Sequence, residues 1–113
     1  MKFIARIALV FVLALSVSLL FAAGSADAKK GKEAFTKSCV QCHGEKGEGK
    51  AAIEKLFGVK MQPLSAKEVQ SMADDQLQKV ILDGKGQMKP VKLAPAEAAN
   101  VVAFIRTFAT EKK

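Results

Sequence analysis

The sequence predicts an all-α domain of three to five short helices. Three observations indicate this class. Apolar residues recur at intervals of three and four along several segments, which is the spacing of one helix face. Alternating patterns typical of strands are weak, and glycine and proline mark the ends of the helical segments. The chain has 113 residues, which is the length of one small domain.

The N-terminal segment, residues 1–28, has the pattern of a secretory signal peptide. A short basic head precedes residues 7–23, which are apolar apart from two serines. Ala26 and Ala28 then occupy the −3 and −1 positions of a small-residue cleavage site. We therefore expect cleavage after Ala28, with cleavage after Ala26 as an alternative. Retention of residues 7–23 as a membrane anchor is the other interpretation.

Removal of this leader leaves residues 29–113, a domain of 85 residues (113 − 28). Its net charge is +6, from 16 basic and 10 acidic residues, and its aromatic residues are four phenylalanines. Small exported domains of this size usually add disulfides or a bound group to their core. Two cysteines allow one disulfide around a tiny loop. We therefore expect a bound group in the middle of the domain.

The N-terminal half of this domain alternates short helices and loops. Gly31, Phe35, Cys39 and Cys42 are spaced by 4, 4 and 3 residues, so they share one face of the first helix. A glycine-rich loop over residues 43–50 follows. The next short helix is predicted over residues 51–58, ending at a glycine. A capping-box pattern then predicts a helix start at the serine of "SAKE", residues 65–68.

Two further helices are predicted in the C-terminal half. Residues 73–84 read "ADDQLQKVILDG", with acidic residues at the positive N-terminal end and a glycine as the stop signal. The last helix begins at Pro95, because proline suits the first helical position. Its apolar face consists of Val101, Phe104, Ile105 and Phe108.

Both cysteines and the only histidine lie in "CVQCH", residues 39–43. A zinc site needs four ligands, and this motif offers three. A thioredoxin-type pair follows a strand in a βαβ unit, which is not predicted here. A simple disulfide leaves His43 unexplained. Covalent haem attachment uses every member, because Cys39 and Cys42 can form thioethers while His43 binds the iron.

The chain resembles the class I c-type cytochromes, the small single-haem electron carriers, over essentially all of residues 29–113. The resemblance rests on Gly31 and Phe35 before "CVQCH", on "LQKVILDGKGQM" and on "VVAFIRTF". It implies a cytochrome c fold, in which the helices wrap around one covalently bound haem c. It also implies that the first helix crosses the last near Gly31, Phe35 and Phe104, and that a methionine-bearing loop covers the other haem face.

Met88 is the predicted second axial ligand of the iron. It lies in "GKGQMKP", the loop in which members of the family carry this ligand, although Lys89 follows it where they often have proline. Met61, in "GVKMQPL", is the second candidate, and an open sixth position is the remaining alternative. The resemblance also implies a proline carbonyl that orients the ring of His43, for which Pro63 is the candidate.

These observations predict a periplasmic carrier of single electrons and not an enzyme. We expect a monomer without stable membrane insertion after leader removal. The thylakoid lumen, or a membrane anchor facing the periplasm, is the alternative location. Nucleic acid is a poor partner, because the chain is exported and lacks an aromatic-basic stripe. Five lysines are expected to form a basic ring that docks acidic patches on redox partners, or else to be ordinary solvated residues: Lys46, Lys50, Lys85, Lys89 and Lys92.

Three other functions stay open on the sequence. The first is a haem enzyme or sensor with a labile sixth position. The second is a binding module that carries a disulfide and no haem. The third is an electron-transfer subunit tethered to a membrane by residues 7–23.

Overall fold

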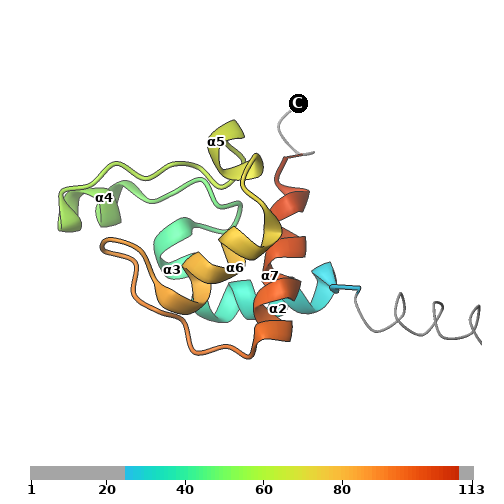
Figure 1. Cartoon of the computed structure of the whole chain (residues 1–113). Coiled ribbons are helices and arrows are strands. Elements are labelled where there is room, and N and C mark those ends of the chain that lie inside the picture. Colours follow the sequence, from blue (N-terminus) through green and yellow to red (C-terminus); the bar gives the residue numbers. More distant parts are fainter. Residues whose placement is uncertain (1–24, 110–113) are drawn as a thin grey trace, which may run out of the picture.

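The structure is a computed structural model in which residues 25–109 are described. This part contains six helical segments and no strand, which confirms the predicted all-α class (Figure 1). The expected number, three to five helices, is too low, because the first predicted helix is divided in two at Cys39. The segments are α2 (Ala28–Ser38), α3 (Val40–His43), α4 (Ala51–Phe57), α5 (Lys67–Gln70), α6 (Asp74–Asp83) and α7 (Pro95–Thr107). Most of the predicted leader, residues 1–24, lies outside the described residues. Within residues 25–109, no helix combines the length and the apolar character needed to cross a membrane.

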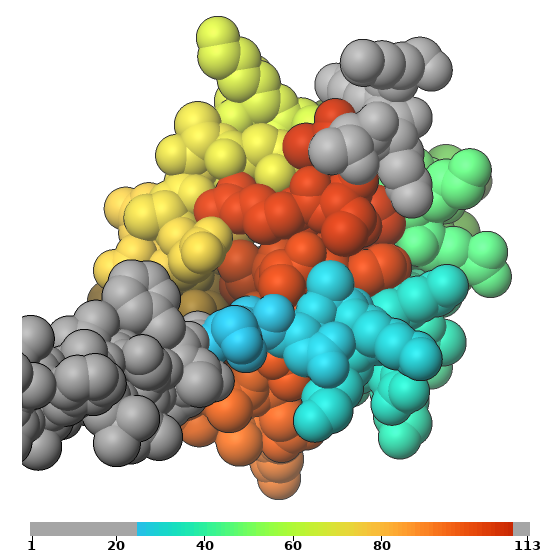
Figure 2. All heavy atoms as spheres, turned by 90° about the vertical axis from the view of Figure 1, so that its right-hand side faces the viewer, coloured from blue at the N-terminus to red at the C-terminus, as the bar shows by residue number. Residues whose placement is uncertain are grey.

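The first and last of these helices cross at Gly31. Figure 2 shows α2, in blue to cyan, lying directly against the red α7. Gly31 is buried, and a Cβ atom at this position would overlap the backbone carbonyl of Asn100 in α7. Glycine is therefore required here to let the two backbones approach. The crossing that the family resemblance implied is confirmed.

Three phenylalanine rings extend this contact. Phe35 of α2 meets Phe104 and Phe108 at centroid distances of 5.2 and 5.6 Å, and the latter two rings are 5.0 Å apart, all in edge-on geometry. Such pairs add to the stability gained from burial alone. The buried core consists of Phe35, Cys39, Leu77, Ile81, Ala98, Val101, Val102, Ile105 and Phe108.

Arg106 fastens the loop between α5 and α6 to α7. Its guanidinium donates hydrogen bonds to the carbonyl oxygens of Gln70, at 2.8 Å, and Met72, at 2.6 Å. It also pairs with the Oδ1 atom of Asp74 at 2.7 Å. Because the Asp74 side chain is 68% exposed, solvent weakens this ion pair. The bonds to the two carbonyls therefore hold the loop.

The predicted helix ends agree with the structure at three places and differ at two. Gly58 ends α4 with a φ of 64°, Gly84 ends α6, and Pro95 begins α7. The predicted start of a helix at Ser65 is wrong, because α5 begins at Lys67 and no side chain caps it. The first helix also breaks at Cys39, whose φ of −118° separates α2 from α3.

A segment that carries α4 extends away from this core (Figure 1). We call residues 44–63 the arm. No residue of the arm belongs to the buried core cluster. The largest exposed apolar side chains of the described residues lie here: Leu56 at 72%, Phe57 at 43% and Val59 at 39%. The arm therefore contributes little to the packing of the helices.

Replacement of Gly31 tests the helix crossing. Gly31→Ala is expected to lower the free energy of unfolding of the haem-loaded protein by about 2 kcal/mol, because the new methyl group overlaps a backbone carbonyl. Helix propensity alone predicts the opposite sign, a gain of about 1 kcal/mol. Denaturant titration followed by circular dichroism distinguishes the two outcomes.

The matched control is Gly58→Ala. A Cβ atom there meets nothing within 4 Å, so the only cost is that of the positive φ, about 1 kcal/mol. If Gly31→Ala were as stable as the wild type or more stable, the close contact would be refuted.

Candidate haem site

The motif at residues 39–43 lies where α2 ends and α3 forms a single turn. The N–H of His43 donates to the carbonyl of Cys39 at 2.9 Å, which closes this turn. Cys39 is 8% exposed and belongs to the core, whereas Cys42 is exposed. Both are free thiols. The face that was predicted to be shared therefore holds for Gly31, Phe35 and Cys39, and Cys42 turns toward solvent.

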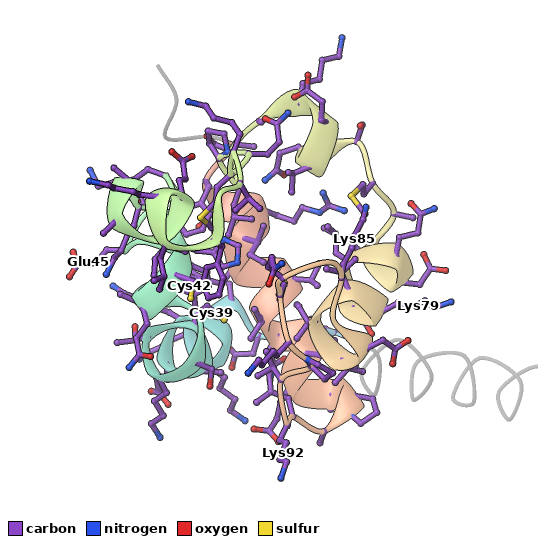
Figure 3. The ribbon with its side chains drawn as sticks, turned by 90° about the vertical axis from the view of Figure 1, so that its left-hand side faces the viewer. Cys39, Cys42, Glu45, Lys79, Lys85 and Lys92 are labelled. Carbon is purple, nitrogen blue, oxygen red and sulfur yellow. The ribbon has the colours of Figure 1, made fainter. Side chains whose placement is uncertain are left out.

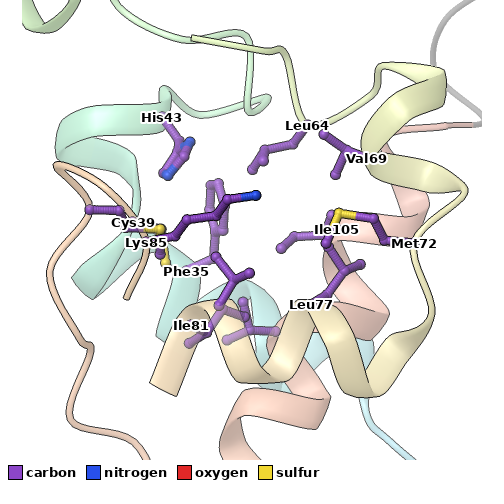
Figure 4. A pocket seen from close by; sticks show the side chains of 13 residues that line it. Phe35, Cys39, His43, Leu64, Val69, Met72, Leu77, Ile81, Lys85 and Ile105 are labelled. Atoms are coloured by element: carbon purple, nitrogen blue, oxygen red, sulfur yellow. The ribbon is translucent and has the colours of Figure 1, made fainter. Parts of the chain in front are cut away.

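Two hollows adjoin this motif. The smaller has a volume of about 150 Å³, and the larger, an open cleft, about 770 Å³. Four residues line both: Cys39, His43, Lys85 and Met88. In Figure 4 the His43 ring points into the smaller hollow, and the Lys85 side chain lies across it. The other walls of the smaller hollow are Phe35, Leu64, Val69, Met72, Leu77, Val80, Ile81, Val101 and Ile105.

Met88 is held by a tight turn between α6 and α7. The N–H of Lys85 donates to the carbonyl of Met88 at 2.9 Å, and the N–H of Met88 donates to the carbonyl of Lys85 at 3.0 Å. Gly84 precedes the turn with a φ of 78°, and a Cβ atom there would lie 2.6 Å from the Met88 carbonyl. A third bond, from the N–H of Val91 to the carbonyl of Ile81 at 2.9 Å, connects the loop back to α6. The chain thus fixes Met88 at the mouth of both hollows.

The other methionines of the described residues occupy different positions. Met61 lines the larger cleft only, and its N–H donates to the carboxylate of Glu54 at 2.9 Å. Met72 lines the smaller hollow only and packs against the core. Among residues 25–109, Met88 is therefore the methionine that shares both hollows with His43.

Burial sets the protonation of the motif. It lowers the pKa of His43 and so favours the neutral imidazole, which is the form that binds metals. Burial, with a smaller contribution from Cys42, raises the pKa of Cys39 to about 11. Cys39 is therefore a thiol at neutral pH and lacks the thiolate character of a redox-active cysteine.

The Nδ1 atom of His43 is buried and has no hydrogen-bond partner among the described residues. The carbonyl of Pro63, the partner that the resemblance implied, accepts the N–H of Ala66 at 2.9 Å instead. The expected bond is thus not found, because Pro63 starts the turn that leads into α5. With Nδ1 enclosed, Nε2 is the ring nitrogen that can reach a ligand in the hollow.

Lysines line the rim of the larger cleft. Lys85, Lys89 and Lys92 of the Met88 loop and Lys37 of α2 are among its lining residues, which include no aspartate or glutamate. Figure 3 shows Lys85 near the centre of this face and Lys92 projecting outward from the loop. Sequence reasoning missed Lys37, because its position depends on the packing of α2 against the loop.

The two lysines predicted from the glycine-rich loop lie elsewhere. Lys46 and Lys50 do not line either hollow. The backbone N–H groups of Glu48 and Lys46 hold the pKa of the Glu48 carboxyl below its usual value, and the charges of Lys46 and Lys50 act in the same direction. Glu48 therefore offsets part of their charge.

The residues of this site fit a haem. Apolar walls suit the flat macrocycle, both cysteines line the larger cleft, and His43 and Met88 line both hollows. Within residues 25–109, no three side chains of histidine, cysteine, aspartate or glutamate converge to hold a metal ion. The imidazole and the thioether that line both hollows are groups of the kinds that bind haem iron.

Comparisons with known proteins agree with this geometry. Residues 26–105 match the family model described as cytochrome C oxidase, cbb3-type, subunit III. The chain belongs to this family of c-type cytochrome domains. A solved structure of the KustC0563 c-type cytochrome is also similar, with 27% sequence identity and a TM-score of 0.61 over 69% of this chain and 95% of that one. A search of curated proteins gave no match.

The resemblance to class I c-type cytochromes, stated from the sequence, is thereby confirmed. The cofactor of this cytochrome is haem c with its iron, and its chemistry is haem-based electron transfer. Its partners are redox proteins.

Proposed function

We propose that this cytochrome is an exported, single-haem carrier of electrons with His43 and Met88 as axial ligands. One observation carries the proposal: His43 and Met88 line the same two hollows, together with the Cys39 thiol. The leader pattern of residues 1–28 supports export, with the periplasm as the destination.

Each residue of the site has a separate role. Cys39 and Cys42 attach the haem as thioethers, so that the exported protein retains it. His43 would bind the iron through Nε2, since Nδ1 is enclosed. When bound, the haem supplies a one-electron couple between ferric and ferrous iron. Met88 would supply the second ligand to the iron, and a thioether ligand raises the reduction potential.

The surrounding residues control water and position. The smaller hollow is walled mainly by apolar side chains, which exclude water and keep the local dielectric low. The two hydrogen bonds between Lys85 and Met88 restrict movement of the ligand-bearing turn. A sulfur atom that is held in place changes its position little between the ferric and ferrous states. A small change in ligand position suits rapid electron exchange.

A basic rim favours acidic partners. Lys37, Lys85, Lys89 and Lys92 border the larger cleft without an acidic neighbour among its lining residues. Such a rim steers encounters with a negatively charged surface and permits quick release. The protein acts as a monomer in this scheme, and each partner meets the same cleft in turn.

A haem enzyme or sensor is a weaker proposal, because a fixed Met88 leaves no open position on the iron. An electron-transfer subunit is the second candidate, and the family match favours it, since the family description names an oxidase subunit. Residues 7–23 would then be retained as an anchor. The mass of the mature protein distinguishes the exported carrier from the anchored subunit, since the anchored subunit keeps its leader.

Covalent haem attachment is tested on protein produced with c-type maturation machinery. We expect the denatured wild-type protein to keep the added mass of one haem and to give the pyridine haemochrome spectrum of a haem with two thioether links. The double variant Cys39→Ser/Cys42→Ser should lose both signals, because no thiol remains to react. A wild-type protein without bound haem mass would favour the module that carries a disulfide and no haem.

The sixth ligand is tested by absorption of the ferric protein. We expect a weak band at the red end of the spectrum, which is characteristic of sulfur ligation by methionine. Met88→Ala should abolish the band and lower the reduction potential, because the thioether ligand is lost. Met61→Ala is the matched control and should retain the band. The reverse pattern would assign the ligand to Met61.

The basic rim is tested with two small oxidants of opposite charge, anionic ferricyanide and cationic tris(phenanthroline)cobalt(III). Lys89→Glu/Lys92→Glu should slow oxidation by ferricyanide at low salt by a factor of about 3–10 and should accelerate oxidation by the cobalt complex. Both effects should fade as salt screens the charges.

The control is Lys32→Glu/Lys67→Glu, which changes the net charge equally at exposed positions outside both hollows. Equal effects in the two double variants would show that net charge alone matters, and the lysines would then be ordinary solvated residues.

A further inference from the structure

Asp27 is part of the fold, although the sequence pattern assigns it to the leader. Its side chain accepts hydrogen bonds from the backbone N–H groups of Lys29, at 2.9 Å, and Lys30, at 3.2 Å. Its carbonyl accepts the N–H of Gly31 at 2.9 Å. Its own backbone nitrogen donates to the Oδ1 atom of Asn100 in α7 at 2.8 Å. Asp27 is thus the N-cap of α2 and a link between the first and last helices.

These bonds lie at the helix crossing. Asn100 provides the side-chain oxygen that binds Asp27, and its backbone carbonyl is the group that a Cβ atom at Gly31 would overlap. The first turn of α2 is therefore held against α7 at both of its ends. Cleavage after Ala28 would remove the cap, the acceptor of the Gly31 N–H and the bond to Asn100 together.

The sequence permits a cut two residues earlier. Cleavage after Ala28 places Ala26 and Ala28 at the −3 and −1 positions, and cleavage after Ala26 places Gly24 and Ala26 there. All of these are small residues that a leader peptidase accepts. Ser25 and Ala26 are exposed and precede α2. The sequence pattern permits both sites, and only the cut after Ala26 keeps Asp27 and its contacts in the mature chain.

We propose that the leader is cut between Ala26 and Asp27, which leaves a mature chain of 87 residues (113 − 26) that begins with Asp27. The step is hydrolysis of one peptide bond by water, which leaves a carboxylate on Ala26 and an amino group on Asp27. That amino group keeps N–H donors for Asn100. The Asp27 carboxylate offsets its charge at the positive end of α2. The inference rests on the proposal that the protein is exported with cleavage of an N-terminal leader.

Intact mass and N-terminal sequencing of the exported, haem-loaded protein test the cut. We expect a single chain that starts at Asp27. A start at Lys29 would overturn this inference and leave the export proposal intact, and a start at any other cleaved position would do the same. A full-length chain would overturn both, and it would favour the anchored subunit.

Thermal unfolding tests the structural reason. Two haem-loaded forms are produced, one starting at Asp27 and one at Lys29. In each form, a leader peptide is fused directly before the intended first residue. The form with Asp27 should have a Tm higher by several degrees. Asn100→Ala should lower the Tm of the Asp27 form more than that of the Lys29 form, because the bond exists only in the former. Identical Tm values for the two forms would remove the basis for the proposed cut.

Discussion

The contact between Gly31 and the backbone carbonyl of Asn100 is the constraint on which the rest of the molecule depends. It sets the distance between α2 and α7. The haem motif begins where α2 ends, and α7 supplies Val101 and Ile105 to the wall of the smaller hollow. The width of the haem site is therefore determined by how closely two backbones meet at the other end of α2. A side chain at residue 31 would disturb a site that it never touches.

The fold and its cofactor depend on each other energetically. Apolar side chains line most of the smaller hollow. An apolar macrocycle packed against these walls would add buried apolar contacts that the side chains alone do not make. A haem bound in this site would also contact segments that are far apart in the chain, since the walls of the two hollows come from α2, α3, α6, α7 and the loop after α6.

Local sequence patterns were enough to predict those helices whose apolar spacing and end signals lie within the helix itself or directly beside it. The apolar spacing along α6 and α7, the glycines after α4 and α6, and the proline that begins α7 are properties of neighbouring residues. The motif at residues 39–43 identified the haem chemistry for the same reason. Met88 and Cys39 both line the two hollows, and their roles as iron ligand and haem attachment point stay predictions.

The features that sequence reasoning missed depend on contacts between distant residues. Arg106 binds Gln70 and Met72, which lie 36 and 34 residues earlier in the chain. Asp27 meets Asn100 across 73 residues. Val102 is buried although it lies outside the predicted apolar face, because α7 packs against both α2 and α6. No local pattern encodes these partners, so they appear only once the helices have been placed.

The arm has a consequence for how this protein family can diverge. Residues 44–63 supply no member of the core, yet Ile53, Phe57, Val59 and Met61 line the larger cleft. Changes in length or sequence within the arm can therefore alter how much of the haem meets water while the helix crossing stays intact. Because solvent exposure is one of the quantities that set the reduction potential of a haem, sequence changes in the arm can shift the potential of this cytochrome without altering the core cluster.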